Sequence, residues 1–400
     1  MFFHLLKPLW KRKFKNMLLT VEILLAFVVV FAVAALGLRY WQLYQMPVGF
    51  QYDSVWSISV RSGEDNAEKL PANLPEQFLR ALKTLPEVEQ VAFANYTPFE
   101  MSTWSTHYQR LDGSQKTRVE LMQVSDDFFS VMSMQTVQGR FFSHVDEAPG
   151  QQSVVLNRAA AAALFPGQNA VGQLIRHGAA SDKNTEILKV TGIVDEFRNR
   201  GDFMTPTNFV LVRQSLLGEN AMLRTILIKL KPGTPRLFEA RLSQQLKLVR
   251  NDWGYRIAPL ADLRSSLLRE QSTPLLILSI LAGFLLLMVA FGLFGVLWQN
   301  TTQRIPEIGL RRAVGAHAGH IYRQIISEQL LLCSLAMLLA LVLLIQLPLT
   351  GLLGANLNWT VFVSAVALAA LVIYAVALLC SLYPAWRASQ LSPTQALHYE

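Results

Sequence analysis

Four long apolar runs constrain this chain more than any other feature. They cover residues 17–38, 274–298, 330–349 and 361–382. A helix needs about 20 apolar residues to cross the hydrocarbon core of a bilayer, and each run has that length. With 52% apolar and only 16% charged residues, the chain is also too apolar for an ordinary soluble protein. The sequence therefore predicts an α-helical membrane protein with four transmembrane helices.

The region between the first two runs, residues 39–273, has the composition of a soluble domain. Strand-like patterns such as Ser54–Val60 and Val88–Ala94 are interspersed with helical patterns such as Arg158–Phe165. This mixed order predicts a large α+β domain between the first and second spans, with one subdomain inserted in another. An amphipathic segment, residues 263–271, predicts a stalk that continues the second span outward.

The distribution of charge predicts the topology. Residues 1–16 carry five basic residues and no acid, whereas residues 39–273 are nearly neutral, with 26 basic and 24 acidic residues. Basic residues beside membrane spans favour the cytoplasmic side. We therefore expect both termini in the cytoplasm and the large domain outside it. Because the basic excess lies at membrane ends, anionic lipid accounts for it, and no nucleic-acid partner is predicted.

The predicted organisation has nine parts, in this order: a cytoplasmic amphipathic N-terminus, 1–16; the first span, 17–38; the extracytoplasmic domain with its stalk, 39–273; the second span, 274–298; a cytoplasmic loop, 299–329; the third span, 330–349; an outer loop, 350–360; the fourth span, 361–382; and a cytoplasmic tail, 383–400.

The loop at 299–329 contains four arginines between two spans without charge. Glu307 and Arg311 are four residues apart with the acid first, which is the favourable order for a helical ion pair. Gly315 is expected to end this helix. His317 and His320 are interpreted as solvated loop residues, and a role in pH sensing is left open.

Several kinds of chemistry have no counterpart in the sequence. No stretch matches the phosphate-binding pattern G-x-x-x-x-G-K-[ST], the nucleophile elbow G-x-S-x-G or the zinc pattern H-E-x-x-H. The second to fourth spans offer few polar side chains, such as Ser279, Ser334 and Tyr374, to a solute at the midplane. Glu22, near the inner end of the first span, is interpreted as pairing at the interface rather than carrying protons. We therefore expect no enzyme, no metal site, and helices that transmit movement.

Two stretches resemble a known family. Residues 304–316 match the pattern R-x-x-E-I-G-x-R-[KR]-A-x-G-A, and residues 384–400 match P-A-x-R-A-x-x-L-x-P-x-x-A-L-x-x-E. Residues 124–143, 154–175 and 190–199 are similar to signature stretches of the same family. The chain thus resembles the MacB, FtsX and LolC/LolE type of ABC transporter permease over its whole length. Pro306, His317 and His320 stand where that family often has basic residues.

This resemblance implies a mechanism and a set of site residues. The loop would hold a coupling helix that docks on a separate ABC ATPase subunit, which would bind the ATP and magnesium, so this chain would bind no cofactor. ATP hydrolysis would then move the extracytoplasmic domain and drive efflux or extraction of a substrate. The docking residues would be Arg304, Glu307, Ile308, Gly309, Arg311, Arg312 and Gly315, and the C-terminal motif would consist of Pro384, Arg387, Pro393 and Glu400.

The resemblance also implies partners and a location. A second permease subunit, identical or paralogous, would complete the transporter in the bacterial inner membrane, and a periplasmic adaptor is a further expected partner. The alternative is an FtsX-like signalling or scaffold protein that regulates a cell-envelope hydrolase. The sequence does not indicate the substrate.

Overall fold

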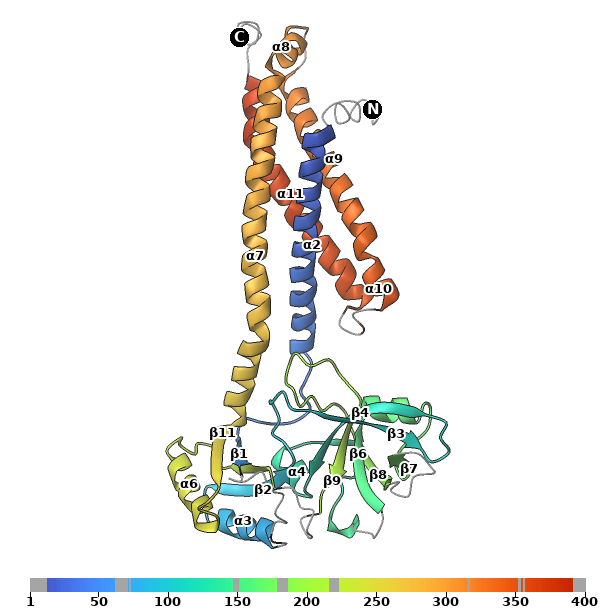
Figure 1. Ribbon diagram of the computed structural model, residues 1–400, viewed down its shortest axis with the longest axis vertical. Coiled ribbons are helices and arrows are strands. Elements are labelled where there is room, and N and C mark those ends of the chain that lie inside the picture. The colour runs from blue at the N-terminus through green and yellow to red at the C-terminus, as the bar shows by residue number, and fades with distance from the viewer. Residues whose placement is uncertain are drawn as a thin grey trace. The chain divides into compact units, whose positions relative to one another are not determined.

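The chain divides into two compact units in the computed structural model. One unit comprises Met1–Gln42 and Ser272–Glu400, and the other comprises Leu43–Gln271. We refer to them as the helix unit and the sheet domain (Figure 1). The structure describes residues 13–390 except 62–70, 72, 147–150, 178–185, 216–222, 315–316, 352–353 and 355–356.

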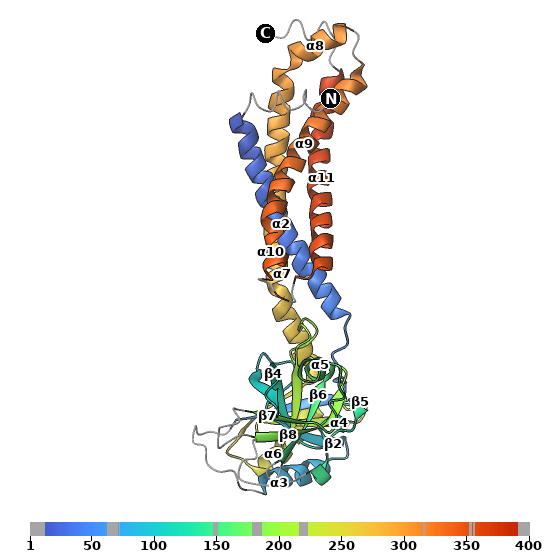
Figure 2. The ribbon, with the colours of Figure 1, turned by 90° about the vertical axis from the view of Figure 1, so that its right-hand side faces the viewer.

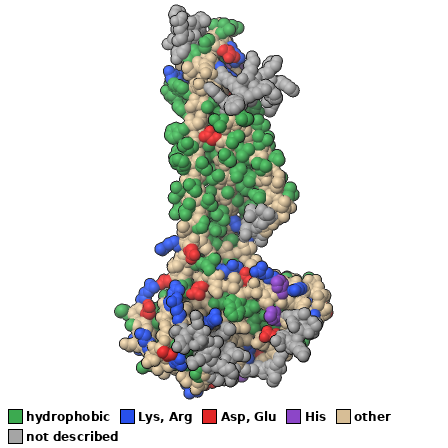
Figure 3. Space-filling view, in the orientation of Figure 1, with side chains coloured by type: hydrophobic (Ala, Val, Ile, Leu, Met, Phe, Trp, Pro, Cys, Tyr) green, Lys and Arg blue, Asp and Glu red, His purple; other side chains and the backbone are tan. Residues whose placement is uncertain are grey.

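Four helices in the described part of the chain are long and apolar enough to cross a membrane. They contain the four predicted spans and extend beyond them: α2 (Lys13–Tyr44), α7 (Leu260–Gln303), α9 (Ala318–Leu344, continued by α10, Gln346–Thr350) and α11 (Trp359–Gln390). The short helix α8 (Ile305–Ala313) lies between α7 and α9 in the sequence. Figure 3 shows hydrophobic side chains covering the visible face of the helix unit, as a lipid-facing surface requires.

Helix α7 is longer than the second predicted span. It has 44 residues, and Pro274, where the sequence places the start of the span, lies inside it. The predicted stalk at residues 263–271 is thus part of the same helix. A proline removes one main-chain donor but does not always end a helix in an apolar environment, where neighbouring groups satisfy the freed carbonyl.

Small residues allow α9 and α11 to approach closely. Cys333, Ala336 and Ala340 of α9 and Ala365 and Ala369 of α11 have no exposed surface. They recur three or four residues apart, which places them on one face of each helix. The hydroxyl groups of Ser334 and Tyr374 also form a 2.7 Å hydrogen bond between the two helices. Packing between small side chains therefore holds this pair of helices together.

The described residues of the sheet domain form eleven strands, three main helices and two short helical turns. Its elements are β1 (Val55–Arg61), α3 (Leu74–Lys83), β2 (Val88–Ala94), β3 (Trp104–Arg110), β4 (Lys116–Val124), α4 (Phe128–Val131), β5 (Thr136–Gly139), η1 (His144–Asp146), β6 (Gln151–Asn157), α5 (Arg158–Leu164), β7 (Leu174–His177), β8 (Glu186–Val194), β9 (Phe209–Arg213), β10 (Thr225–Leu230), α6 (Phe238–Val249) and β11 (Gly254–Pro259).

The strand order divides this domain into two subdomains. Strands β11, β1, β10 and β2 form an antiparallel sheet, on one face of which α3 and α6 pack (Figure 1). The chain order β1-α3-β2 and β10-α6-β11 is that of a split β-α-β sheet. The remaining core strands pair in a ring, β4-β3-β7-β8-β6-β9, which closes through the parallel pairing of β9 with β4. Because the ring lies between β2 and β10 in the sequence, it is the inserted subdomain that the sequence predicts.

Candidate functional site

Helix α8 has one buried face and one exposed face. Ile305 and Ile308 are buried, and Ile308 packs with Ile321 and Ile325 of α9. On the other face, Leu310 is 61% exposed, and Val314, which directly follows the helix, is 83% exposed. Figure 2 shows α8 beside the adjoining ends of α7 and α9. The predicted docking residue Ile308 therefore faces the helix unit itself, whereas Leu310, which the prediction omitted, lies on the accessible face.

A chain of polar contacts fastens α8 to α9. Arg304, just before α8, binds the Glu328 carboxylate at 2.7 Å, and the Gln324 amide donates to the other Glu328 oxygen at 3.0 Å. Arg311 donates to the Gln324 side-chain oxygen at 3.1 Å and to Glu307 at 2.5 Å. The predicted pairing of Glu307 with Arg311 is present. We call these five residues the α8 latch.

Sequence reasoning missed the two latch residues that belong to α9. Gln324 and Glu328 are separated from their arginine partners by 13 and 24 residues, so no local spacing links them. The available signal was their own separation of four residues in an otherwise apolar stripe, which places both side chains on one face of a helix. Two polar side chains on an apolar face require partners, and α8 provides them.

A cavity of about 70 Å³ lies under the latch. Side chains of α2, α7, α8 and α9 line it, and they are both polar, as in Asn300, Thr301 and the latch residues, and apolar, as in Leu19 and Leu297. The polar part of such a cavity has room for water. Helix α8 therefore rests on hydrogen bonds and a narrow apolar contact rather than on a continuously packed core, and such an arrangement permits a small movement of the helix.

The other predicted site residues are placed differently. Gly309 is buried, Gly315 lies outside the described residues, and for Arg312 only the main chain is described. In α11, Pro384 is buried, and the Arg387 guanidinium lies 4.5 Å from the centre of the Trp298 ring of α7. Pro393 and Glu400 lie outside the described residues. Arg387 of the C-terminal motif therefore contacts α7 of the same unit.

Aromatic stacking surrounds Arg387. The rings of Trp298 and Tyr383 are 6.0 Å apart and almost parallel, and Phe294 and Trp386 extend the stack. An arginine on the face of a tryptophan is a favourable cation–π contact, and aromatic groups of this kind lie at membrane interfaces. The stack therefore joins the ends of α7 and α11 and marks the level of a membrane surface.

The histidines of the predicted loop at 299–329 and the acid of the first span lie in different surroundings. His317 and His320 are exposed, with ring centres 6.1 Å apart. Glu22 of α2 lies against Gly292 of α7, where an added Cβ would come within 2.9 Å of the carboxylate. Among the residues that the structure describes, no three His, Cys, Asp or Glu side chains come together as a metal site.

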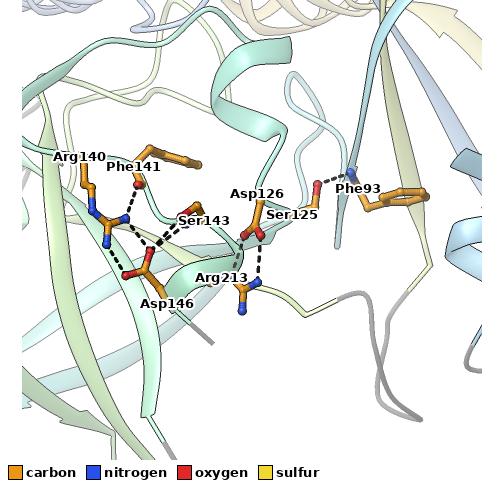
Figure 4. Close-up of polar contacts among 8 residues, drawn as sticks. All are labelled: Phe93, Ser125, Asp126, Arg140, Phe141, Ser143, Asp146 and Arg213. Carbon is orange, nitrogen blue, oxygen red and sulfur yellow. Dashed lines mark hydrogen bonds and ion pairs between the residues drawn. The ribbon is translucent and has the colours of Figure 1, made fainter. Parts of the chain in front are cut away.

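The signature stretch at residues 124–143 fastens the ring subdomain (Figure 4). Asp126, which follows β4, accepts two hydrogen bonds from Arg213 of β9, at 2.7 and 2.9 Å. Arg140 donates to both carboxylate oxygens of Asp146, at 2.6 and 2.5 Å. Asp146 also accepts the Ser143 main-chain N–H at 2.9 Å. These residues hold loops in place, and nothing in their geometry indicates a binding site.

Two family models match successive parts of the chain. A family model of the MacB-like periplasmic core domain matches residues 18–245, and a model of the FtsX-like permease C-terminal matches residues 279–393. The first match alone covers more than half of the chain. This protein therefore belongs to the MacB/FtsX-type family of ABC transporter permeases, and it is a multi-pass membrane protein.

The chain is also similar to individual proteins. The macrolide export ATP-binding/permease protein MacB of Salmonella typhimurium is 26% identical over 369 residues, which is 86% of this chain and 52% of MacB. MacB of Agrobacterium fabrum is 25% identical over 334 residues, with coverage of 81% and 49%. The chain thus spans about half the length of the curated relatives it matches. The crystal structure of the periplasmic region of MacB from Actinobacillus actinomycetemcomitans aligns over 56% of this chain and 97% of that one, with 16% identity and a TM-score of 0.39.

Proposed function

We propose that this ABC transporter permease works by mechanotransmission. Helix α8 would dock on an ABC ATPase subunit, which would bind the ATP and magnesium, since no stretch of the 400 residues has the phosphate-binding pattern. Closure of the ATPase pair would move α8, and the spans would carry that movement to the sheet domain outside the membrane. The domain would then drive efflux or extraction of a substrate.

The observation that carries this proposal is the way α8 is held. A short helix with an exposed apolar and charged face, fastened by the α8 latch over a cavity of mixed lining, is suited to receive a partner and to pass on a displacement. Its buried face connects that displacement to α9 through Ile308 and Ile321.

The polar groups of the spans support movement rather than solute passage. Ser279 donates to the carbonyl of Leu275, Ser334 donates to that of Leu330, and Ser381 donates to that of Leu378. Each hydroxyl is thus bonded within its own helix, which leaves it poorly placed to replace the hydration of a polar cargo.

The docking role predicts loss of coupling when the exposed face of α8 is changed. Leu310→Glu places a charge on that face without removing any latch residue, so the fold should persist while stimulation of the partner ATPase is lost. We expect the same loss from Arg311→Glu. The measurement is ATPase activity of the complex, purified from the host membrane through a tag on this chain and reconstituted in vesicles.

The matched control is Arg323→Glu, which reverses an exposed charge in the first turns of α9 outside the latch. This variant should retain stimulation. Stimulation by Leu310→Glu and Arg311→Glu equal to that by the unaltered chain would refute docking through α8.

A further inference from the structure

Arg198 is a buried cation in the sheet domain with no exposed surface. Its guanidinium donates to four main-chain carbonyls: that of Leu43 at 3.1 Å, that of Met46 at 2.8 Å, that of Met204 at 3.0 Å, and that of Asp202. Removing a charge from water is costly unless hydrogen bonds replace the lost hydration. These four contacts supply that replacement, and they join two segments that are about 150 residues apart in the chain.

The first of these segments is the end of a membrane helix. Leu43 lies in the last turn of α2, where helix carbonyls have no partner within the helix. A positive charge at that position also interacts favourably with the negative end of the helix dipole. Arg198 therefore caps the last residues of α2, which belong to the sheet domain from Leu43 onward.

The second segment binds the first part of α7, which belongs to the sheet domain up to Gln271. The carboxylate of Asp202 accepts two hydrogen bonds from Arg264 of α7, at 2.9 and 2.8 Å. Only 6% of the Asp202 side chain and 22% of the Arg264 side chain are exposed. The Arg264 guanidinium also lies over the rings of Tyr44 and Tyr52, at 5.9 and 5.0 Å.

The segment that follows α2 lies in close main-chain contact with the segment around Arg198. The N–H of Arg198 donates to the Val48 carbonyl at 2.9 Å, and the N–H of Gly201 donates to the Arg198 carbonyl at 3.0 Å. Gly49 has a φ of +93°, and a Cβ there would come within 1.8 Å of the Glu196 carbonyl oxygen. Only glycine permits this approach, so the segment after α2 is pressed against the segment that carries Arg198.

We propose that Arg198, Asp202 and Arg264 form a junction that fixes the adjoining ends of α2 and α7 to the sheet domain at a constant separation. A change in the position of either helix would then move the domain as a body. The proposal that this junction transmits movement rests on the proposed function. The proposal that it keeps the two helix ends at a constant separation does not.

The constant separation is tested by spin labels at two exposed positions, Gln45→Cys and Ser266→Cys, in a full-length chain whose native cysteines, Cys333 and Cys380, are replaced by alanine. We expect a narrow distance distribution that broadens with Asp202→Asn. This substitution keeps the main-chain carbonyl that Arg198 uses and removes only the charge that holds Arg264. Arg198→Met should broaden the distribution further.

The control Arg80→Met removes an exposed ion pair with Glu76, of 3.1 Å, within α3 of the same domain, and it should leave the distribution narrow. An unchanged distribution in Asp202→Asn would overturn the junction. Equal broadening by Arg80→Met would also overturn it, because the effect would then be one of general stability.

The transmitting role is tested on the complex with its ATPase. We expect ATP with vanadate to change hydrogen exchange in the sheet domain of the unaltered chain. In Asp202→Asn, ATP turnover should persist while that change is lost. Retention of the change in a variant with a broadened distance distribution would refute transmission through this junction. A lack of any response in the unaltered chain would instead refute the proposed function and leave the measured separation valid.

Discussion

Asp146 is held in its charged form by the residues around it. Hydrogen bonds from Arg140, followed by that from the Ser143 main chain, hold the pKa of the Asp146 carboxyl below its usual range, although partial burial opposes them. Because the pKa is lower in the folded chain than in the unfolded chain, the pair stabilises the fold above the unfolded value of about 3.9. This stabilisation is lost as the pH falls through the folded pKa.

Asp146→Asn should therefore lower the free energy of unfolding of the sheet domain by about 1 kcal/mol at neutral pH, since the Arg140 side chain is more than half exposed and the pair is partly screened. The difference from the unaltered chain should vanish at acidic pH. Urea titration of the intact chain in detergent, followed by tryptophan fluorescence, measures both effects. Glu76→Gln, which breaks an exposed pair with Arg80, is the control, and a deficit that persists unchanged at low pH would contradict the assignment.

Residues that act through distant partners could not be identified from the sequence. Glu307 and Arg311 were predictable because a helix brings positions four apart together. Arg198 and Asp202 gave no such signal, since their partners lie in segments that meet only in the folded domain. The predicted docking residues therefore include both buried and exposed side chains. A family pattern does not distinguish Ile308, which packs inward, from its exposed neighbours.

At the scale of elements, apolar periodicity identified the helices and strands that have one clearly buried face. The predicted strand Val88–Ala94 coincides with β2, and the predicted helix Arg158–Phe165 differs from α5 by one residue. Strand β3 (Trp104–Arg110) was missed because six of its seven residues are at least partly exposed, so its sequence lacks apolar alternation. Its pairing with β4 and β7 holds it in place, and that long-range pairing leaves no local pattern.

The α8 latch makes a prediction at this scale. Glu328→Gln removes the carboxylate that binds Arg304, and both side chains are mostly buried. Losing this charged hydrogen bond should destabilise the attachment of α8 by about 1.5 kcal/mol, which corresponds to roughly tenfold faster exchange of its main-chain amides. Hydrogen–deuterium exchange of the intact chain measures this rate. Arg323→Gln should leave it unchanged, and slow exchange in both variants would mean that apolar packing alone holds α8.

At the scale of the whole molecule, the helix unit leaves one span largely uncovered. In the most apolar stretch of α7, 11% of the residues are buried, against 28–33% in the other three spans. Ser279 and Gly283 are exposed on α7 and are four residues apart, and a Cβ at Gly283 would meet no described atom within 4 Å. Small residues with this spacing permit close contact between membrane helices. We predict that a second permease subunit, identical or paralogous, covers this face, and the case of two identical copies can be tested directly.

If α7 of one copy packs against α7 of another, Gly283→Cys in a chain without Cys333 and Cys380 should form disulfide-linked dimers in native membranes under mild oxidation. The Cα atoms must approach within about 7 Å for such a bond, so the reaction reports direct helix contact. Leu371→Cys, on the exposed face of α11, is the matched control and should remain monomeric on a non-reducing gel. Equal cross-linking at both positions would indicate random collision, and cross-linking only at Leu371→Cys would place the contact on α11 instead.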